Sequence, residues 1–169
     1  MKTIEQLRNS FTNLRSVITD ISIDSLSKNH NLDFDVYLPS VGKNLQRGLV
    51  WAAFQKKELI YSIFIGRQIP SCAIVDREVG GKRIIEVIDG KQRLTTLLGF
   101  YRNEFAVEID GTHYFYSDLP KDYQFEIKRY TVRFHVVYEN YTAHDKPITD
   151  EQKVSWFHYI NFAGTPQEK

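Results

Sequence analysis

The chain has a single cysteine, Cys72, among its 169 residues, which excludes an internal disulfide and a metal cluster built on cysteines. Cys72 lies in an apolar, strand-like run, so it is expected in the core. No apolar stretch approaches the roughly 20 residues that a membrane-spanning helix requires. The first residues also lack the hydrophobic region of a signal peptide. We therefore expect a cytoplasmic protein with no membrane partner.

An excess of charge of one sign is also missing. The net charge is +1, so there is no strong overall field to attract DNA, and any nucleic-acid contact would need a local basic patch. The sequence has no Gly-x-x-x-x-Gly-Lys-Ser/Thr loop, no Gly-x-Gly-x-x-Gly fingerprint and no His-Glu-x-x-His pair. Its histidines are scattered without zinc-like spacing. The common signatures of nucleotide, dinucleotide and zinc sites are therefore absent.

What is present is an ordinary globular composition, with 42% hydrophobic residues and an aromatic content that suits a β-containing core. Residues 1–30 are expected to form a helix and a connector, and residues 31–169 a single domain. Within that domain the patterns predict strands at 33–38 and 130–138, helices at 52–65 and 91–102, and a terminal helix opened by a Thr149-x-x-Gln152 capping box. Hairpins are expected at 71–88 and 105–116. The fold class predicted is α+β, with a small mixed sheet and flanking helices.

The most informative stretch begins with a β-branched run, Ile84 to Ile88, that predicts a buried strand. It stops at Asp89-Gly90, and the leucines that follow fall at helical spacing. A helix that starts at Lys91 directs its free N–H groups and the positive end of its dipole toward whatever lies over the turn, which favours an anion. The plainer interpretation is that Asp89 caps the helix, Gly90 serves the turn, and the cations are solvated.

A second pattern loosely resembles a metal-dependent nuclease, in which two acids bind a divalent cation and a lysine positions water. Asp76 followed by Asp89-x-Lys91 has the required residue types. In such enzymes the second acid and the lysine project the same way from one strand. Gly90 and the immediate start of the helix are expected to break that alternation here.

Three stretches in this order are identifiable together. They are Gln46-Arg47-x-x-x-Trp51, Ile88-Asp89-Gly90-Lys91-Gln92-Arg93-Leu94-Thr95-Thr96, and Phe157-x-x-Ile160-Asn161-x-Ala163-Gly164-Thr165. With them, residues 33–169 resemble the domain-of-unknown-function family that forms the N-terminal half of GmrSD-type restriction enzymes and also occurs in SspE-like phage-defence proteins. That family is similar in turn to the ParB/sulfiredoxin-like fold.

The resemblance implies a pocket that binds a nucleoside triphosphate, with hydrolysis as an open further step and a DNA-related or phage–host conflict process as the setting. Carried over by position, the catalytic residues would be Asp89, Gln92 and Arg93. The phosphate-binding residues would be Gln46, Arg47, Gly90, Lys91 and Asn161. Asp89 would also hold a Mg²⁺ ion. Arginine pairs grip phosphate oxygens well, and placement with charge neutralisation supplies most of phosphoryl-transfer catalysis.

Two departures from the family limit this implication. Lys91 stands where the family's central motif usually has a glutamine, which puts a water-orienting amide in doubt. The long C-terminal region of the restriction enzymes, with its histidine nuclease centre, does not follow Asn161, so a protein partner is expected to supply that centre. The alternatives are a non-catalytic module that binds nucleic acid or protein, and a ParB-like DNA-nicking nuclease.

Overall fold

The computed structural model describes residues 3–4, 14, 16–46, 48–139 and 147–163. For residues 162 and 163 it describes the backbone only. The helices are α2 (Ile23–Ser27), α3 (Ala53–Phe64), α4 (Lys91–Tyr101), α5 (Lys121–Arg129) and α6 (Asp150–Ala163), with a 3₁₀ turn at Tyr116–Asp118. The strands are β1 (Ser16–Ser22), β2 (Leu32–Asp33), β3 (Tyr37–Leu38), β4 (Lys43–Asn44), β5 (Cys72–Val79), β6 (Lys82–Asp89), β7 (Val107–Ile109), β8 (Thr112–Tyr114) and β9 (Thr131–Tyr138).

The main sheet has five strands in the order β1-β9-β5-β6-β2. β9 is antiparallel to β1 and parallel to β5, and β6 is antiparallel to β5 and parallel to β2, so the sheet is mixed. Gly80 and Gly81 join β5 to β6 with φ values of 57° and 75°, the left-handed conformation that a tight hairpin needs. The predicted α+β class, with its small mixed sheet, is confirmed.

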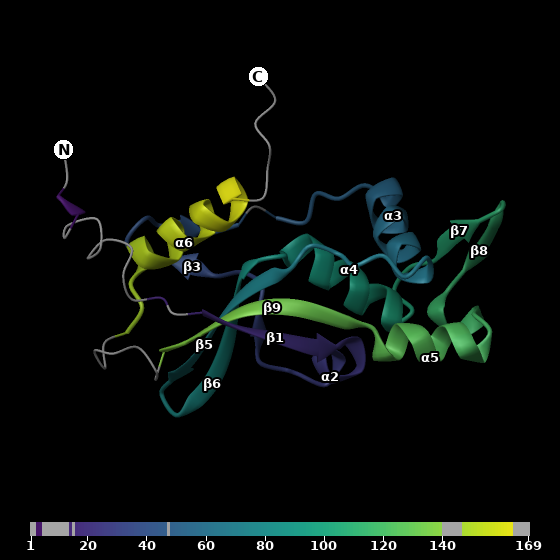
Figure 1. Cartoon of the computed structure of the whole chain (residues 1–169), viewed down its shortest axis with the longest axis horizontal. Coiled ribbons are helices and arrows are strands. Elements are labelled where there is room, and N and C mark those ends of the chain that lie inside the picture. Colours follow the sequence, from purple (N-terminus) through teal and green to yellow (C-terminus); the bar gives the residue numbers. More distant parts are fainter. Residues whose placement is uncertain (1–2, 5–13, 15, 47, 140–146, 164–169) are drawn as a thin grey trace, which may run out of the picture.

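Each face of this sheet is covered by a different group of elements. Alternate strand residues such as Ile74, Val87 and Phe134 join a core cluster with α2, α3, α4 and α5. The opposite residues, such as Val75 and Ile88, pack with the β3 segment and α6. Figure 1 shows α6 and β3 at one end of the molecule and α3, α5 and the β7–β8 hairpin at the other, with α4 between them.

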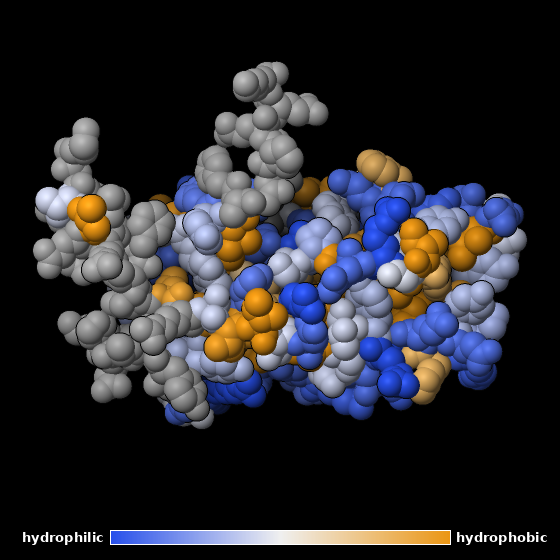
Figure 2. Space-filling model, viewed as in Figure 1, coloured by the Kyte–Doolittle hydropathy of each residue, from blue (hydrophilic) through white to orange (hydrophobic). Residues whose placement is uncertain are grey.

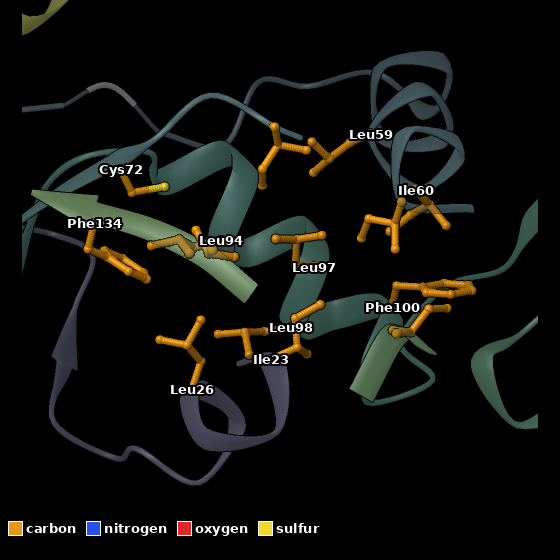
Figure 3. Packing of buried hydrophobic residues seen from close by; sticks show 14 of the residues in the cluster. Ile23, Leu26, Leu59, Ile60, Cys72, Leu94, Leu97, Leu98, Phe100 and Phe134 are labelled. Carbon is orange, nitrogen blue, oxygen red and sulfur yellow. The ribbon is translucent and has the colours of Figure 1, made fainter. Parts of the chain in front are cut away.

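Helix α4 is the central element of the larger cluster. Leu94, Leu97 and Leu98 are at most 3% exposed, as their helical spacing predicted. Figure 3 shows these side chains between Phe134 of β9, Ile23 and Leu26 of α2, and Leu59 and Ile60 of α3. Because α4 is packed against all of these elements, its first turn is held in a fixed position at the end of β6.

One prediction near the N-terminus was wrong. The helix expected within residues 1–30 is replaced over Ser16–Ser22 by strand β1, which pairs along its length with β9. The β-branched run Val17, Ile18 and Thr19 is the local reason, because such residues favour strands. β1 and α2 therefore join the same sheet and core as the later residues. The rest of the expected helix lies outside the described residues.

The strand expected at 33–38 is divided into β2 and β3, which belong to different sheets. The Asp33 carboxylate accepts a hydrogen bond from the Asp35 amide at 2.9 Å, which closes a turn in the middle of the predicted strand. An aspartate side chain thus overrides the alternating pattern. The same turn brings Asp35 to the start of α4.

The other predicted elements are confirmed. α3 ends just before Gly66, whose φ is 68°, and the β7–β8 hairpin turns at Asp110 and Gly111 with φ values of 48° and 76°. The capping box of α6 forms in both directions, since Thr149 Oγ1 accepts from the Gln152 amide at 3.2 Å and Gln152 Oε1 from the Thr149 amide at 2.9 Å.

The surface in Figure 2 is mostly hydrophilic, with separate apolar patches rather than one continuous band. Among the residues that the structure describes, no helix has the length and apolar character needed to cross a membrane.

Candidate functional site

The β6–α4 turn is built on a glycine that no other residue can replace without strain. Gly90 has φ 102° and ψ 10°, in the left-handed region. A Cβ at this position would lie 2.3 Å from Cys72 Sγ and 2.9 Å from Cys72 Cβ. The backbone of the turn therefore lies directly against the first residue of β5, and the predicted order of strand, tight turn and helix is confirmed.

The first turn of α4 leaves its backbone donors open. The first hydrogen bond of the helix runs from the Leu94 amide to the Gly90 carbonyl at 2.9 Å. Within the described part of the chain, no acceptor is bonded to the amides of Lys91, Gln92 or Arg93. Three N–H groups and the positive end of the helix dipole thus meet in one place, which is the arrangement that binds anions.

Asp89 and Arg93 flank these amides and pair with each other. Arg93 Nη2 donates to Asp89 Oδ2 at 2.6 Å and to the Ser71 carbonyl at 3.1 Å. The pair is largely but not completely buried, with 15% of the Asp89 side chain and 19% of the Arg93 side chain exposed. Arg93 Nε is buried and has no partner among the described residues, nor does Asp89 Oδ1 accept a hydrogen bond from them. The site therefore keeps one unused donor and one unused acceptor.

Cys72 lies behind the turn and is part of the core, as predicted. Burial raises the pKa of its thiol to about 11, even though the Arg93 guanidinium beside it acts in the opposite direction. Burial also works against the charge of Arg93, but Cys72 and Asp89 keep the Arg93 pKa above its ordinary value. At neutral pH the site thus contains a neutral thiol and a charged guanidinium, and the thiol is not a nucleophile.

Lys91 is directed to a partner that the sequence did not indicate. Its side chain is only 6% exposed and its ammonium forms an ion pair with Asp35, whose own side chain is 70% exposed. Nothing in the spacing of two residues this far apart links them, so the pair was missed. The predicted contact between Lys91 and phosphate stays a prediction. It would require the ammonium to leave or share Asp35.

Gln92 and Gln46 fix the segment that precedes α3. Gln92 Oε1 accepts from the Val50 amide at 3.2 Å and its Nε2 donates to the Gly48 carbonyl at 2.8 Å. Gln46 Nε2 donates to the Val87 carbonyl at 2.7 Å, two residues before Asp89. The structure thus brings Gln46 and Gln92 to the β6–α4 turn, where their amides hold the loop. Their predicted roles toward phosphate stay predictions.

The structure does not test the predicted roles of the two remaining residues, Arg47 and Asn161. Arg47 lies outside the described residues. Asn161 is exposed near the end of α6, and its Nδ2 donates to the Phe157 carbonyl of the same helix at 2.8 Å. Its predicted role in closing the pocket stays a prediction.

Asp89 and Lys91 do not project from one strand, as the interruption at Gly90 predicted, because β6 ends at Asp89 and α4 begins at Lys91. The two acids of the nuclease-like pattern do not pair either. Asp76 is opposite Ile85 in the hairpin, whereas Asp89 is opposite Ala73. The Asp76 carboxylate instead receives Arg83 Nη2 at 2.5 Å and Arg83 Nε at 2.9 Å. The two carboxylates are therefore bound by different arginines, Asp76 in the middle of β5 and Asp89 opposite the start of that strand.

Comparison with known proteins gives one match. The family model described as the GmrSD restriction endonuclease, N-terminal domain, matches residues 23–169. The match includes the Gln46, Asp89–Arg93 and Asn161 segments. No curated protein and no solved structure matches the chain.

Proposed function

The chain belongs to the family of GmrSD restriction endonuclease N-terminal domains, and from this premise we propose that it binds the triphosphate of a nucleoside triphosphate at the first turn of α4. The family gives a restriction or phage-defence setting, and cytoplasmic location and a ParB/sulfiredoxin-like fold are parts of the same proposal. The observation that carries it is the group of three backbone amides after Gly90, those of Lys91, Gln92 and Arg93, which have no acceptor among the described residues. A phosphate group matches these donors in charge and in geometry.

Arg93 is the side chain best placed to add to these amides. Its guanidinium is already fixed by Asp89 and by the Ser71 carbonyl, so little conformational freedom is lost when it meets a phosphate. Asp89 Oδ1 fits a single-oxygen contact with Mg²⁺, an ion that proteins hold through one or two carboxylates together with substrate phosphates. A bound Mg²⁺ ion would supply neutralisation of phosphate charge. Asp89 would hold it and keep Arg93 oriented.

The arrangement favours binding over hydrolysis by this chain alone. Asp89 is paired with Arg93 and Lys91 with Asp35, so the side chains that would orient water are engaged. We therefore propose that turnover, where it occurs, involves a partner protein that also supplies the nuclease centre, with DNA as the target. A module that binds without catalysis is the second candidate, and these two ion pairs are the observation in its favour.

Binding is tested by isothermal titration with each nucleoside triphosphate and with inorganic tripolyphosphate, with and without Mg²⁺. Arg93→Gln is expected to weaken binding by roughly 10- to 100-fold, because hydrogen bonds to charged groups are the stronger ones. Asp89→Asn should weaken chiefly the Mg²⁺-dependent part, because asparagine keeps an oxygen that accepts from Arg93 but loses the negative charge. Asp76→Asn is the matched control, since it alters the other aspartate–arginine pair of the same hairpin.

The proposal fails if no nucleotide and no tripolyphosphate binds, or if Asp76→Asn has the same effect as Arg93→Gln. Phosphate release distinguishes the two candidates. Release that disappears in Asp89→Asn supports turnover, and binding without release supports the non-catalytic module. Plasmid nicking that survives both Asp89→Asn and Arg93→Gln would exclude this site as a nuclease centre.

A further inference from the structure

The two members of the ion pair between Lys91 and Asp35 are buried to very different extents. The Lys91 side chain is 6% exposed, whereas the Asp35 side chain is 70% exposed. The Asp76–Arg83 pair is the reverse, with a carboxylate that is 11% exposed and a guanidinium that is 60% exposed. Separation would cost Asp35 little, because water can solvate its carboxylate, but it would leave Lys91 as an uncompensated buried charge. Lys91 therefore requires an anion, and Asp35 is an anion that a ligand can replace.

The ammonium of Lys91 also has hydrogen-bond donors that its partner does not use. An ammonium carries three N–H donors. Within the described part of the chain, Asp35 Oδ1 is the single acceptor of the Lys91 ammonium. Two donors therefore remain for a ligand, on a side chain that is already almost completely withdrawn from water.

Asp35 and Lys91 leave the main sheet at the same end. β2 is parallel to β6, with Leu32 opposite Ile85, and each member of the pair lies two positions after the end of its strand. Lys91 is also the first residue of α4, so its own backbone amide is one of the open amides of the candidate phosphate site. In phosphate-binding loops, a lysine directly after a glycine at a helix start reaches the phosphates. The Lys91 ammonium can therefore reach a phosphate group on these amides as well as Asp35.

The backbone around Asp35 is held in place, whereas its carboxylate is free to turn away. The Asp35 amide donates to Asp33 Oδ1 at 2.9 Å. On either side of Asp35, Phe34 packs against the main core cluster and Val36 is 1% exposed. The Asp35 carboxylate has no partner other than Lys91 among the described residues. Release of Lys91 therefore needs only a rotation of the Asp35 side chain into solvent.

We propose that Asp35 is a positioning residue for Lys91: in the free protein it holds the ammonium at the edge of the phosphate site, and a bound phosphate group replaces it. Asp35 is then a competitor within the chain that lowers the affinity for phosphate. The location of the phosphate rests on the proposed function, whereas the exchange of partners rests on the ion pair itself.

The test is isothermal titration of the full chain with inorganic tripolyphosphate at constant ionic strength. Asp35→Asn removes the competing charge and should tighten binding roughly tenfold, because hydrogen bonds to charged groups are the stronger ones. Lys91→Met should weaken binding, and Asp35→Asn should lose most of its effect in that background. Asp20→Asn is the matched control, since Asp20 forms an exposed pair with Arg133 at the opposite edge of the sheet.

Urea denaturation distinguishes this role of Asp35 from a purely structural one. Without ligand, Asp35→Asn should lower the denaturation midpoint, because Lys91 is left buried without an anion. Tripolyphosphate should raise the midpoint more in Asp35→Asn than in the wild type, because it binds the variant more tightly. Asp35→Glu keeps a carboxylate and should stay near the wild type in both measurements. A residue that only held its loop would lower stability and affinity together.

The outcomes separate the exchange of partners from the proposed function. Wild-type binding of tripolyphosphate that Asp35→Asn does not tighten would overturn the exchange and leave the phosphate site standing. An equal gain from Asp35→Asn with and without Lys91→Met would also overturn it, because charge alone would then explain the gain. Binding by Asp35→Asn but not by the wild type, abolished by Lys91→Met, would support the exchange and contradict the proposed function of the wild type. Absence of binding in every variant would overturn both.

Discussion

Strand β6 carries a cluster of charged side chains on each of its two faces. The two clusters differ in whether hydrogen-bonding groups beside them remain free to bind a ligand. On one face, Glu86 Oε1 accepts from Arg77 at 3.1 Å and from Lys153 at 2.9 Å. Arg77 also approaches Glu139 at 3.5 Å, and Glu139 accepts from the Ile148 amide at 2.9 Å. This network joins β5, β6, the segment after β9 and α6. On the other face, Asp89 pairs with Arg93 only four residues away.

Charged residues of the same types therefore stabilise the fold in one cluster and leave neighbouring groups free to bind a ligand in the other. In the network each charge has an opposite charge from another element, and the Lys153 side chain is 2% exposed. Its groups hold α6 to the sheet. Two of its buried atoms, Arg77 Nε and Glu86 Oε2, form no hydrogen bond with the described residues, but they lie 3.5 Å from Glu139 and 2.7 Å from Lys153 in ion pairs. Asp89 and Arg93 pair with each other within one helical turn. The neighbouring backbone amides at the start of α4 have no acceptor among the described residues. We expect changes in the network to affect mainly stability and changes at the turn to affect mainly binding.

The largest effect is expected from Lys153→Met, which leaves Glu86 buried with Arg77 as its remaining partner. Removing one member of a buried ion pair costs about 3–5 kcal/mol of unfolding free energy, and urea denaturation measures it. The control is Lys128→Met, because Lys128 is 49% exposed and lies 3.8 Å from Asp24. An exposed pair of this kind contributes little. Equal losses in the two variants would show that the network is not a structural anchor.

Gly90→Ala is expected to have the next largest effect, because it combines a left-handed backbone with a clash against Cys72. The two terms together should cost about 2–4 kcal/mol. Gly111→Ala isolates the first term, since Gly111 has φ 76° and nothing within 4 Å of an added Cβ. Adding Cys72→Ala to Gly90→Ala should restore part of the loss relative to each single variant. Absence of such coupling in denaturation would contradict the close packing of this turn.

Alkaline pH should destabilise the folded protein because the Cys72 thiol, which is packed against the β6–α4 turn, must lose its proton. Its pKa is about 11 in the folded protein, against about 8.5 in an unfolded chain. The folded state therefore binds more protons between these values, and the unfolding free energy falls as pH rises through this window. By pH 10 the fall from this one group should be about 1–2 kcal/mol. Cys72→Ala, measured at pH 7 and pH 10, should lose that much less, while the tyrosines contribute equally to both proteins.

Local patterns were enough to predict the elements around this turn. The β-branched run before Asp89 predicts strand β6, and the leucine spacing after Gly90 predicts helix α4. Both elements are present as predicted. The errors arose where a side chain acts on the backbone, as in the Asp33–Asp35 turn, or where a strand pairs with a distant one, as β1 does with β9. Such pairings depend on the whole fold and leave no periodic signal.

The sequence predicted which residues lie together at the β6–α4 turn, but not the partners of their side chains. The sequence placed Asp89, Gly90 and Arg93 together because they are adjacent in one turn of helix. It did not indicate that Lys91 pairs with Asp35, that Cys72 lies under Gly90, or that Lys153 reaches Glu86. Each of these contacts joins residues from separate elements, so only the tertiary structure decides them.

The smallest effect is expected from Gln92, whose side chain ties the loop before α3 to the turn. Gln92→Leu removes the hydrogen bonds to the Val50 amide and the Gly48 carbonyl, at a cost of about 0.5–1.5 kcal/mol. Gln92→Glu keeps the acceptor for the Val50 amide and should cost less. Hydrogen exchange of the Val50 and Trp51 amides should become faster in Gln92→Leu, with Gln92→Glu intermediate. If nucleotide affinity falls in Gln92→Leu while hydrogen exchange in the loop is unchanged, Gln92 contacts the ligand itself. In that case Gln92 belongs to the binding site and does not only hold the loop before α3.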